Sequence, residues 1–120
     1  MQPQKERILC VDDDADTCEA ITILLGYKYE TKGIKDAHEA MEVAQQEAFD
    51  LYIIDTWLPG HPDNELCRKL RTSAPQTPII VYSAAVYHAD RKAAFEAGAT
   101  TFVAKPYVDK LLEAVSQFLG

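Results

Sequence analysis

The sequence predicts an α/β fold in which a doubly wound parallel sheet of five strands is covered by five helices. Short apolar runs alternate five times with segments whose apolar residues recur at helical spacing, which is the βα order of such folds. Three runs, at residues 7–11, 51–54 and 78–82, are nearly continuous, as expected of strands that helices cover on both faces. A length of 120 residues suits a single domain, 1–120, with its core at about 7–119.

The first predicted strand is the run RILCV at residues 7–11, which follows a polar tail. It ends abruptly at three consecutive acids, Asp12, Asp13 and Asp14. A helix is predicted next, because apolar residues recur at helical spacing at Cys18, Ile21, Leu24 and Leu25. Asp14 or Asp16 is its predicted N-cap, since a carboxylate there accepts hydrogen bonds from free backbone amides.

The second predicted helix lies between a weaker strand at 29–34 and the strand LYII at 51–54. It is predicted from one apolar stripe, made up of Ala37, Met41, Ala44 and Ala48. Asp55 follows the third strand directly. Because a buried carboxylate is costly without a partner, Asp55 either has a partner there or is a reactive group.

The second half of the chain continues the alternation. A helix is predicted from about 63 to 71, and the strand PIIVY follows at 78–82. An alanine-rich helix at 87–97 is predicted to end at Gly98, a natural C-cap residue. The fifth strand is TFVA at 101–104, and the last helix carries an apolar stripe at Val108, Leu111, Leu112, Val115 and Leu119.

Composition excludes several classes of protein. The 12 basic and 19 acidic residues give a net charge of −7, which argues against direct nucleic-acid binding by this domain. Cys10, Cys18 and Cys67 form no C-x-x-C pair and lie in apolar patterns, so we interpret them as buried thiols of a reducing compartment. Neither a signal peptide nor an apolar run of about 20 residues is visible, which predicts a cytoplasmic protein without membrane contact.

Chemically able residues follow four of the five predicted strands, namely Asp12, Asp13, Asp55, Ser83 and Lys105. Carboxyl ends of parallel strands meet at one edge of the sheet, so these side chains should lie together. Crowded carboxylates repel one another, which would either raise a pKa or demand a cation. Oxygen ligands suit Mg²⁺ better than zinc. The lysine and the hydroxyl add an anion-binding half, and the combination points to phosphoryl transfer onto an aspartate. Singly, the acids could be helix caps or turn residues, but that does not explain their coincidence at the strand ends.

The chain resembles the receiver domain of two-component response regulators over residues 8–119. Four motifs carry the resemblance: ILCVDDD, DLYIIDTWLPG, PIIVYSA and AGATTFVAKPY. The resemblance implies a flavodoxin-like sheet of order 2-1-3-4-5 and a phosphorylation-dependent signalling switch of a phosphorelay. Such a domain accepts a phosphoryl group from a kinase phosphohistidine. It is not expected to be an enzyme, since it catalyses only its own phosphorylation and dephosphorylation.

The resemblance also assigns the metal site. It implies that Asp55 is the phosphoacceptor and that Asp13 and Asp55 bind Mg²⁺ through their carboxylates. The backbone carbonyl of Trp57 would complete the protein ligands, and Asp12 would act through the water shell.

The remaining roles concern the phosphoryl group and the response to it. By resemblance, Lys105 pairs with Asp55 and then with the phosphoryl oxygens, while the Ser83 hydroxyl and the Ala84 amide hold the phosphate. Ser83 and Phe102 would form the switch: Ser83 moves inward, Phe102 turns into the vacated space, and the surface of the fourth helix, fifth strand and fifth helix changes.

Two positions depart from the family pattern. A glycine that usually opens the third helix is missing near Asp63, where the chain reads GHPDN, so we expect an altered loop with Asp63 or Asn64 in the left-handed conformation. Trp57 occupies a position that is often small or polar, and its indole is expected over the mouth of the site.

The expected partners are a sensor histidine kinase or phosphotransfer protein, and a downstream target or an output domain outside this chain. The domain is expected to be a monomer or a phosphorylation-dependent dimer. Receivers joined to winged-helix domains usually carry acids before the fifth strand and arginines on the fifth helix. Thr100, Thr101 and residues 114–117 do not support that type of dimer.

Three rival interpretations remain. A degenerate receiver could act as a phosphorylation-independent interaction module, although Asp13, Asp55, Ser83 and Lys105 are intact. An aspartate-nucleophile phosphatase is less favoured, because no second aspartate lies two residues after Asp55. A flavin-binding module lacks a phosphate-binding loop after the first strand.

Overall fold

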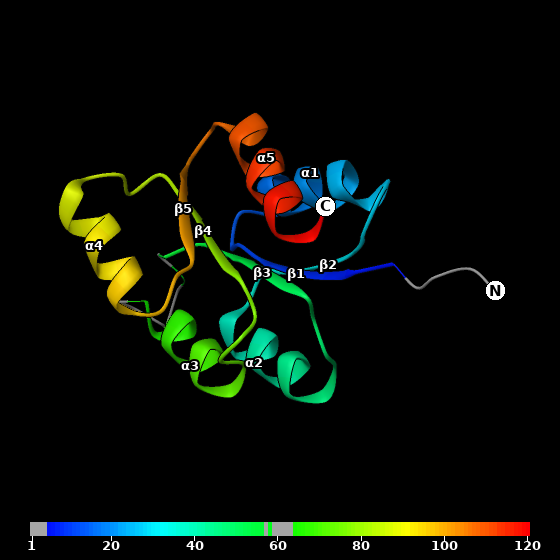
Figure 1. The fold of residues 1–120 in the computed structure, drawn as a ribbon, viewed down its shortest axis with the longest axis horizontal. Helices are drawn as coiled ribbons and strands as arrows, with labels where there is room; N and C mark the ends of the chain where they lie inside the picture. The colour runs from blue at the N-terminus through cyan, green and yellow to red at the C-terminus, as the bar shows by residue number, and fades with distance from the viewer. Residues whose placement is uncertain (1–4, 57, 59–63) are drawn as a thin grey trace.

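The computed structural model describes residues 5–56, 58 and 64–120. A five-stranded parallel sheet of order β2-β1-β3-β4-β5 lies between two layers of helices, which confirms the predicted fold class (Figure 1). The strands are β1 (Arg7–Val11), β2 (Glu30–Ile34), β3 (Leu51–Ile54), β4 (Ile79–Ser83) and β5 (Thr101–Ala104). The helices are α1 (Ala15–Gly26), α2 (Ala37–Gln46), α3 (Glu65–Ser73), α4 (His88–Glu96) and α5 (Val108–Leu119).

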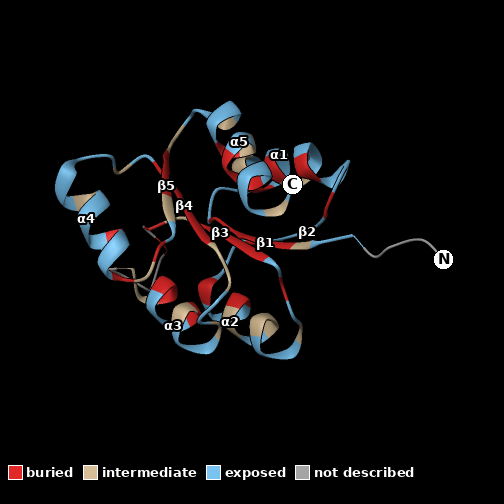
Figure 2. Cartoon of the chain, in the orientation of Figure 1, coloured by how far each residue is buried: buried red, intermediate tan, exposed pale blue. Residues whose placement is uncertain are grey.

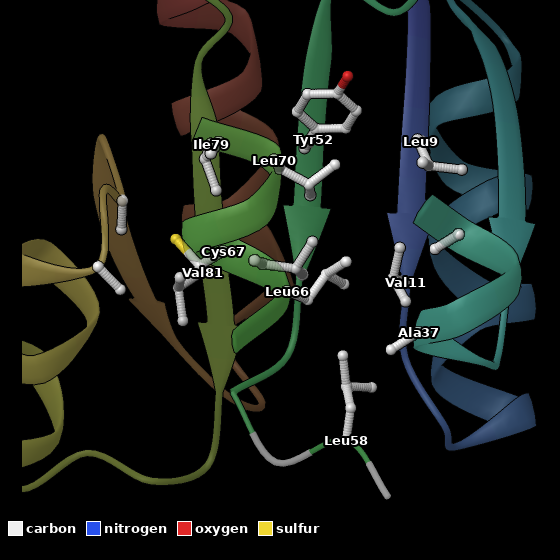
Figure 3. Packing of buried hydrophobic residues seen from close by; sticks show 14 of the residues in the cluster. Leu9, Val11, Ala37, Tyr52, Leu58, Leu66, Cys67, Leu70, Ile79 and Val81 are labelled. Carbon is white, nitrogen blue, oxygen red and sulfur yellow. The ribbon is translucent and has the colours of Figure 1, made fainter. Parts of the chain in front are cut away.

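The core has two parts, one on each face of the sheet. Helices α2, α3 and α4 cover one face, and α1 and α5 cover the other (Figure 1). Side chains of a strand alternate between the faces, so Leu9 and Val11 join the first part while Ile8 and Cys10 join the second. The strands are buried almost throughout except β2, which lies at an edge (Figure 2). Figure 3 shows α3 packed on β3 and β4 through Leu66, Cys67 and Leu70.

Two residues of the predicted apolar stripes, Leu24 and Ala48, are exposed. Leu24 is 43% exposed, because the buried face of α1 is formed by Cys18, Ile21 and Leu25. Ala48 is exposed and lies beyond the end of α2, since the backbone at Glu47 is already extended. Both predicted helices are present, but Ala48 lies outside α2, because a spacing of three or four residues does not show where a helix ends or how wide its buried face is.

The start of α3 confirms one prediction about backbone conformation. Asn64, the N-cap residue, has φ of 61°, in the left-handed region that asparagine tolerates better than most residues. The rest of the predicted unusual loop, residues 59–63 with Asp63 included, lies outside the described residues. At the end of α4, Gly98 has φ of 117°, as predicted for a helix-terminating glycine.

Arg71 of α3 joins that helix to the α4–β5 connection. Its guanidinium donates hydrogen bonds to the carbonyl of Gly98 at 3.0 and 2.9 Å and to the hydroxyl of Thr100 at 3.1 Å. It also donates to carbonyls after α3, at 3.0 Å for Ala74 and 2.7 Å for Thr77. A Cβ on Gly98 would lie 2.8 Å from the Arg71 side chain, so this close approach requires glycine.

The cysteine prediction is confirmed in its structural part, because Cys10, Cys18 and Cys67 are free and buried. In the part of the chain that the structure describes, none of the helices has the length and apolar character needed to cross a membrane.

Candidate functional site

Three carboxylates meet at the carboxyl edge of the sheet. Asp12 and Asp13 follow β1, and Asp55 follows the neighbouring β3. One oxygen of each carboxylate lies within 4.8 Å of the others. Asp12 is 2% exposed, Asp55 is partly buried and Asp13 is exposed, so the group is open to solvent on one side. The predicted cluster of acids is therefore present.

Lys105 is the cation of this cluster. The last residues of β5 deliver it to the same edge, and its Nζ lies 2.8 Å from Asp12 Oδ2 and 3.1 Å from Asp55 Oδ2. Its backbone amide donates to the carbonyl of Ser83, which extends the β4–β5 pairing beyond the strand and fixes the direction of the side chain. The strand ends alone predicted that these residues lie together. In the structure, Lys105 is in direct contact with both Asp12 and Asp55.

Burial and the neighbouring charges shift the pKa in opposite directions, both for Asp12 and for Lys105. Burial raises the pKa of Asp12 above its ordinary value, and the hydrogen bond from Lys105 offsets only part of that rise. Burial alone would lower the pKa of Lys105, but the hydrogen bond to Asp12 and the charge of Asp55 outweigh it, so that pKa is raised. The charged form of Lys105 is therefore stabilised. The charged form of Asp12 would be stabilised further by a second cation.

Ser83 ends β4 at the same edge and is completely buried. Its Oγ lies 2.9 Å from Thr56 Oγ1 and accepts a hydrogen bond of 3.1 Å from the amide of Ala85. Thr56 also donates its backbone amide to Asp55 Oδ1 at 2.7 Å. Thr56 was not among the predicted site residues, and only the register between β3 and β4 reveals it: Ile54 pairs with Val81, so Thr56 lies opposite Ser83.

Phe102, the predicted switch aromatic, is a buried residue of β5 on the face covered by α2, α3 and α4. The guanidinium carbon of Arg91, on α4, lies 4.8 Å from the centre of its ring. Ala84 is exposed in the connection after β4. Trp57, whose carbonyl was predicted as a metal ligand, lies outside the described residues.

The donor set fits a hard divalent cation. Asp12, Asp13 and Asp55 offer carboxylate oxygens only, and the open side at Asp13 leaves room for water. An ammonium and a buried hydroxyl at the same edge add groups that attract and hold an anion. Together they can bring a cation and a phosphoryl oxygen to one carboxylate.

A doubly wound parallel sheet with acids and a lysine at its switch-point edge defines the class of α/β domains that bind ligands at that edge. The chain belongs to the response regulator receiver domain family, whose model matches residues 8–116. It is 35% identical over 115 residues to the DNA-binding response regulator MtrA of Mycobacterium tuberculosis, covering 95% of this chain and 50% of MtrA. It is 31% identical to the response regulator MprA of Mycobacterium leprae, covering 94% and 50%.

Solved structures agree with the family. A receiver domain protein from Methanospirillum hungatei has a TM-score of 0.90 at 27% identity, covering 97% of this chain and 94% of that one. A response regulator from Chloroflexus aurantiacus has a TM-score of 0.88 at 30% identity, covering 97% and 98%. The BeF3-activated DrrB receiver domain has a TM-score of 0.88 at 27% identity, with the same coverage. The chain spans about half the length of MtrA and MprA.

Proposed function

We propose that this domain is a phosphorylation-dependent switch of a two-component phosphorelay, with Asp55 as the phosphoacceptor. The observation that carries the proposal is the contact of Asp55 with Lys105 at 3.1 Å inside a cluster of acids. A carboxylate held beside an ammonium and a cation site can attack phosphorus and have the incoming negative charge neutralised. The donor would be the phosphohistidine of a sensor kinase or of a phosphotransfer protein.

In the transfer, a carboxylate oxygen of Asp55 forms a bond to phosphorus and the phosphorus–nitrogen bond of the phosphohistidine breaks. The electron pair leaves with the imidazole. Lys105 then turns its ammonium from Asp55 toward a phosphoryl oxygen, while the Ser83 hydroxyl and the Ala84 amide donate to the others. Asp13, Asp55, the Trp57 carbonyl and, through water, Asp12 would hold Mg²⁺. When bound, that ion neutralises charge on the phosphoryl oxygens.

The output is a change of the surface formed by α4, β5 and α5. Ser83 and Phe102 lie in the adjoining strands β4 and β5, so a displacement of Ser83 can be transmitted to the Phe102 ring and to Arg91 above it. A downstream protein, or an output domain elsewhere in a longer chain, would read that surface. MtrA is described as a DNA-binding regulator, and here DNA binding would belong to such an output domain and not to the acidic receiver.

The test is phosphorylation by a small donor. Incubation with acetyl phosphate and Mg²⁺ should add one phosphoryl group, measured by intact mass, and Asp55→Asn should abolish the adduct. Asp14→Asn, a change in an exposed acid next to the cluster, should retain it. An adduct that persists in Asp55→Asn would reject the assigned acceptor. A wild type that is never phosphorylated would favour the phosphorylation-independent interaction module.

Asp13→Asn should separate the stability of the fold from metal binding. In EDTA, it should raise the free energy of unfolding by about 1–2 kcal/mol, because it removes one charge from a cluster of acids at a functional site. Mg²⁺ should raise the melting temperature of the wild type and have little effect on the variant. A lower melting temperature in EDTA would show instead that Asp13 is structural.

A further inference from the structure

The hydroxyl pair of Thr56 and Ser83 connects β3 to β4 inside the protein. Thr56 is 8% exposed and Ser83 is 0% exposed, so water does not compete for their hydrogen bond of 2.9 Å. Thr56 follows Asp55 in the chain, and its backbone amide donates to Asp55 Oδ1. Thr56 therefore contacts the proposed phosphoacceptor, Asp55, through its backbone, and it contacts the Ser83 hydroxyl through its side chain.

The number of hydrogen bonds that Ser83 can make limits how it can respond to a phosphoryl group. A serine hydroxyl has one hydrogen and two acceptor positions, and the amide of Ala85 already occupies one of these positions. To hold a phosphoryl oxygen, Ser83 must direct its hydrogen to that oxygen and move toward Asp55. Either hydroxyl can donate in the bond between Thr56 and Ser83, and in both cases the bond keeps the Ser83 oxygen beside Thr56. Movement of Ser83 toward the phosphoryl group must therefore lengthen or break this bond, so the two interactions compete for the position of the hydroxyl.

We propose that Thr56 is a positioning residue that sets the threshold of the switch: its hydroxyl stabilises the resting arrangement of Ser83 and opposes its capture by the phosphoryl group. This inference rests on the proposed function and extends it to a residue outside the metal and phosphate ligands. Removing the hydroxyl at constant shape should shift the equilibrium toward the switched state by the equivalent of one buried hydrogen bond, about two- to tenfold.

The experiment uses beryllofluoride with Mg²⁺ as a phosphoryl analogue and compares the wild type with Thr56→Val and Thr56→Ser. Valine keeps the branched shape and removes the hydroxyl, whereas serine keeps the hydroxyl. Thr56→Val should bind beryllofluoride about two- to tenfold more tightly than the wild type, and Thr56→Ser should restore the wild-type affinity. General structural damage would weaken binding, so the direction of the change separates the two explanations.

A second readout does not depend on affinity. The amide of Ala85 donates to Ser83, so its NMR shift reports the position of that hydroxyl. In Thr56→Val without beryllofluoride, this shift should move toward its value in the beryllofluoride complex of the wild type. If valine does not fold, Thr56→Ala should give the same displacement.

The outcomes distinguish this inference from the function on which it rests. A wild type that does not bind beryllofluoride overturns both. A wild type that binds, together with a Thr56→Val affinity that is equal or weaker and an unmoved Ala85 amide, overturns only the role of Thr56. A Thr56→Ser variant that binds as tightly as Thr56→Val would also overturn the role of the Thr56 hydroxyl, because serine keeps that hydroxyl and the change could not then come from its removal.

Discussion

Replacing Arg71 by leucine is expected to lower the free energy of unfolding by about 3 kcal/mol, although Arg71 lies far from the acids in sequence. Its guanidinium donates hydrogen bonds to the carbonyls of Gly98, Ala74 and Thr77 and to the hydroxyl of Thr100. Leucine keeps the apolar stem but leaves the three partly buried carbonyls without their charged donor. The denaturant midpoint in urea should fall with little change in the slope.

The matched control is Lys69→Leu on the same helix. Lys69 makes an exposed ion pair of 2.9 Å with Glu65, which is worth at most about 1 kcal/mol. A small effect of this variant beside a large effect of Arg71→Leu would assign the loss to the α4–β5 contacts. Equal and small effects would mean that water replaces the guanidinium at those carbonyls.

Lys105→Met is expected to destabilise the metal-free protein by about 3 kcal/mol at neutral pH, because it leaves Asp12 buried without its cation. It should also prevent most of the phosphorylation of Asp55. Adding Asp12→Asn to Lys105→Met should recover stability but not phosphorylation. Lys110→Met, which alters an exposed pair with Glu113 on α5, should change stability by less than about 1 kcal/mol.

The pH dependence of the Lys105 effect has a defined sign. Burial raises the pKa of Asp12 in the folded protein, so its protonated form favours folding and the penalty appears as pH rises through that raised pKa. Without Lys105, the free-energy cost of burying the charged Asp12 should be larger. The stability difference between wild type and Lys105→Met should therefore narrow as the pH falls below about 4, where Asp12 becomes protonated in both the folded and the unfolded state. A difference that stays constant with pH would mean that Asp12 is not the cause.

Strand ends explain why so much of the site could be predicted. Parallel strands all point the same way, so knowing where β1, β3 and β5 end is enough to bring Asp12, Asp55 and Lys105 to one edge. Thr56 was missed because recognising it requires the register between two strands, which periodicity within one strand does not contain. Arg71 was missed for a similar reason: its acceptors come from two connections that are separated in the chain and converge only in the fold.

The Arg71 contacts also determine how α4 can move. They hold Gly98 and Thr100, just past the C-terminal end of this helix, whereas its N-terminal end follows Ser83 through the short connection 84–87. One end of α4 is therefore anchored and the other adjoins the residue that phosphorylation would displace. A small displacement at Ser83 would rotate α4 about its C-terminal end, so the N-terminal turn would move furthest. Tyr87 and His88 lie at that turn and are exposed, so they would travel furthest for a partner to detect.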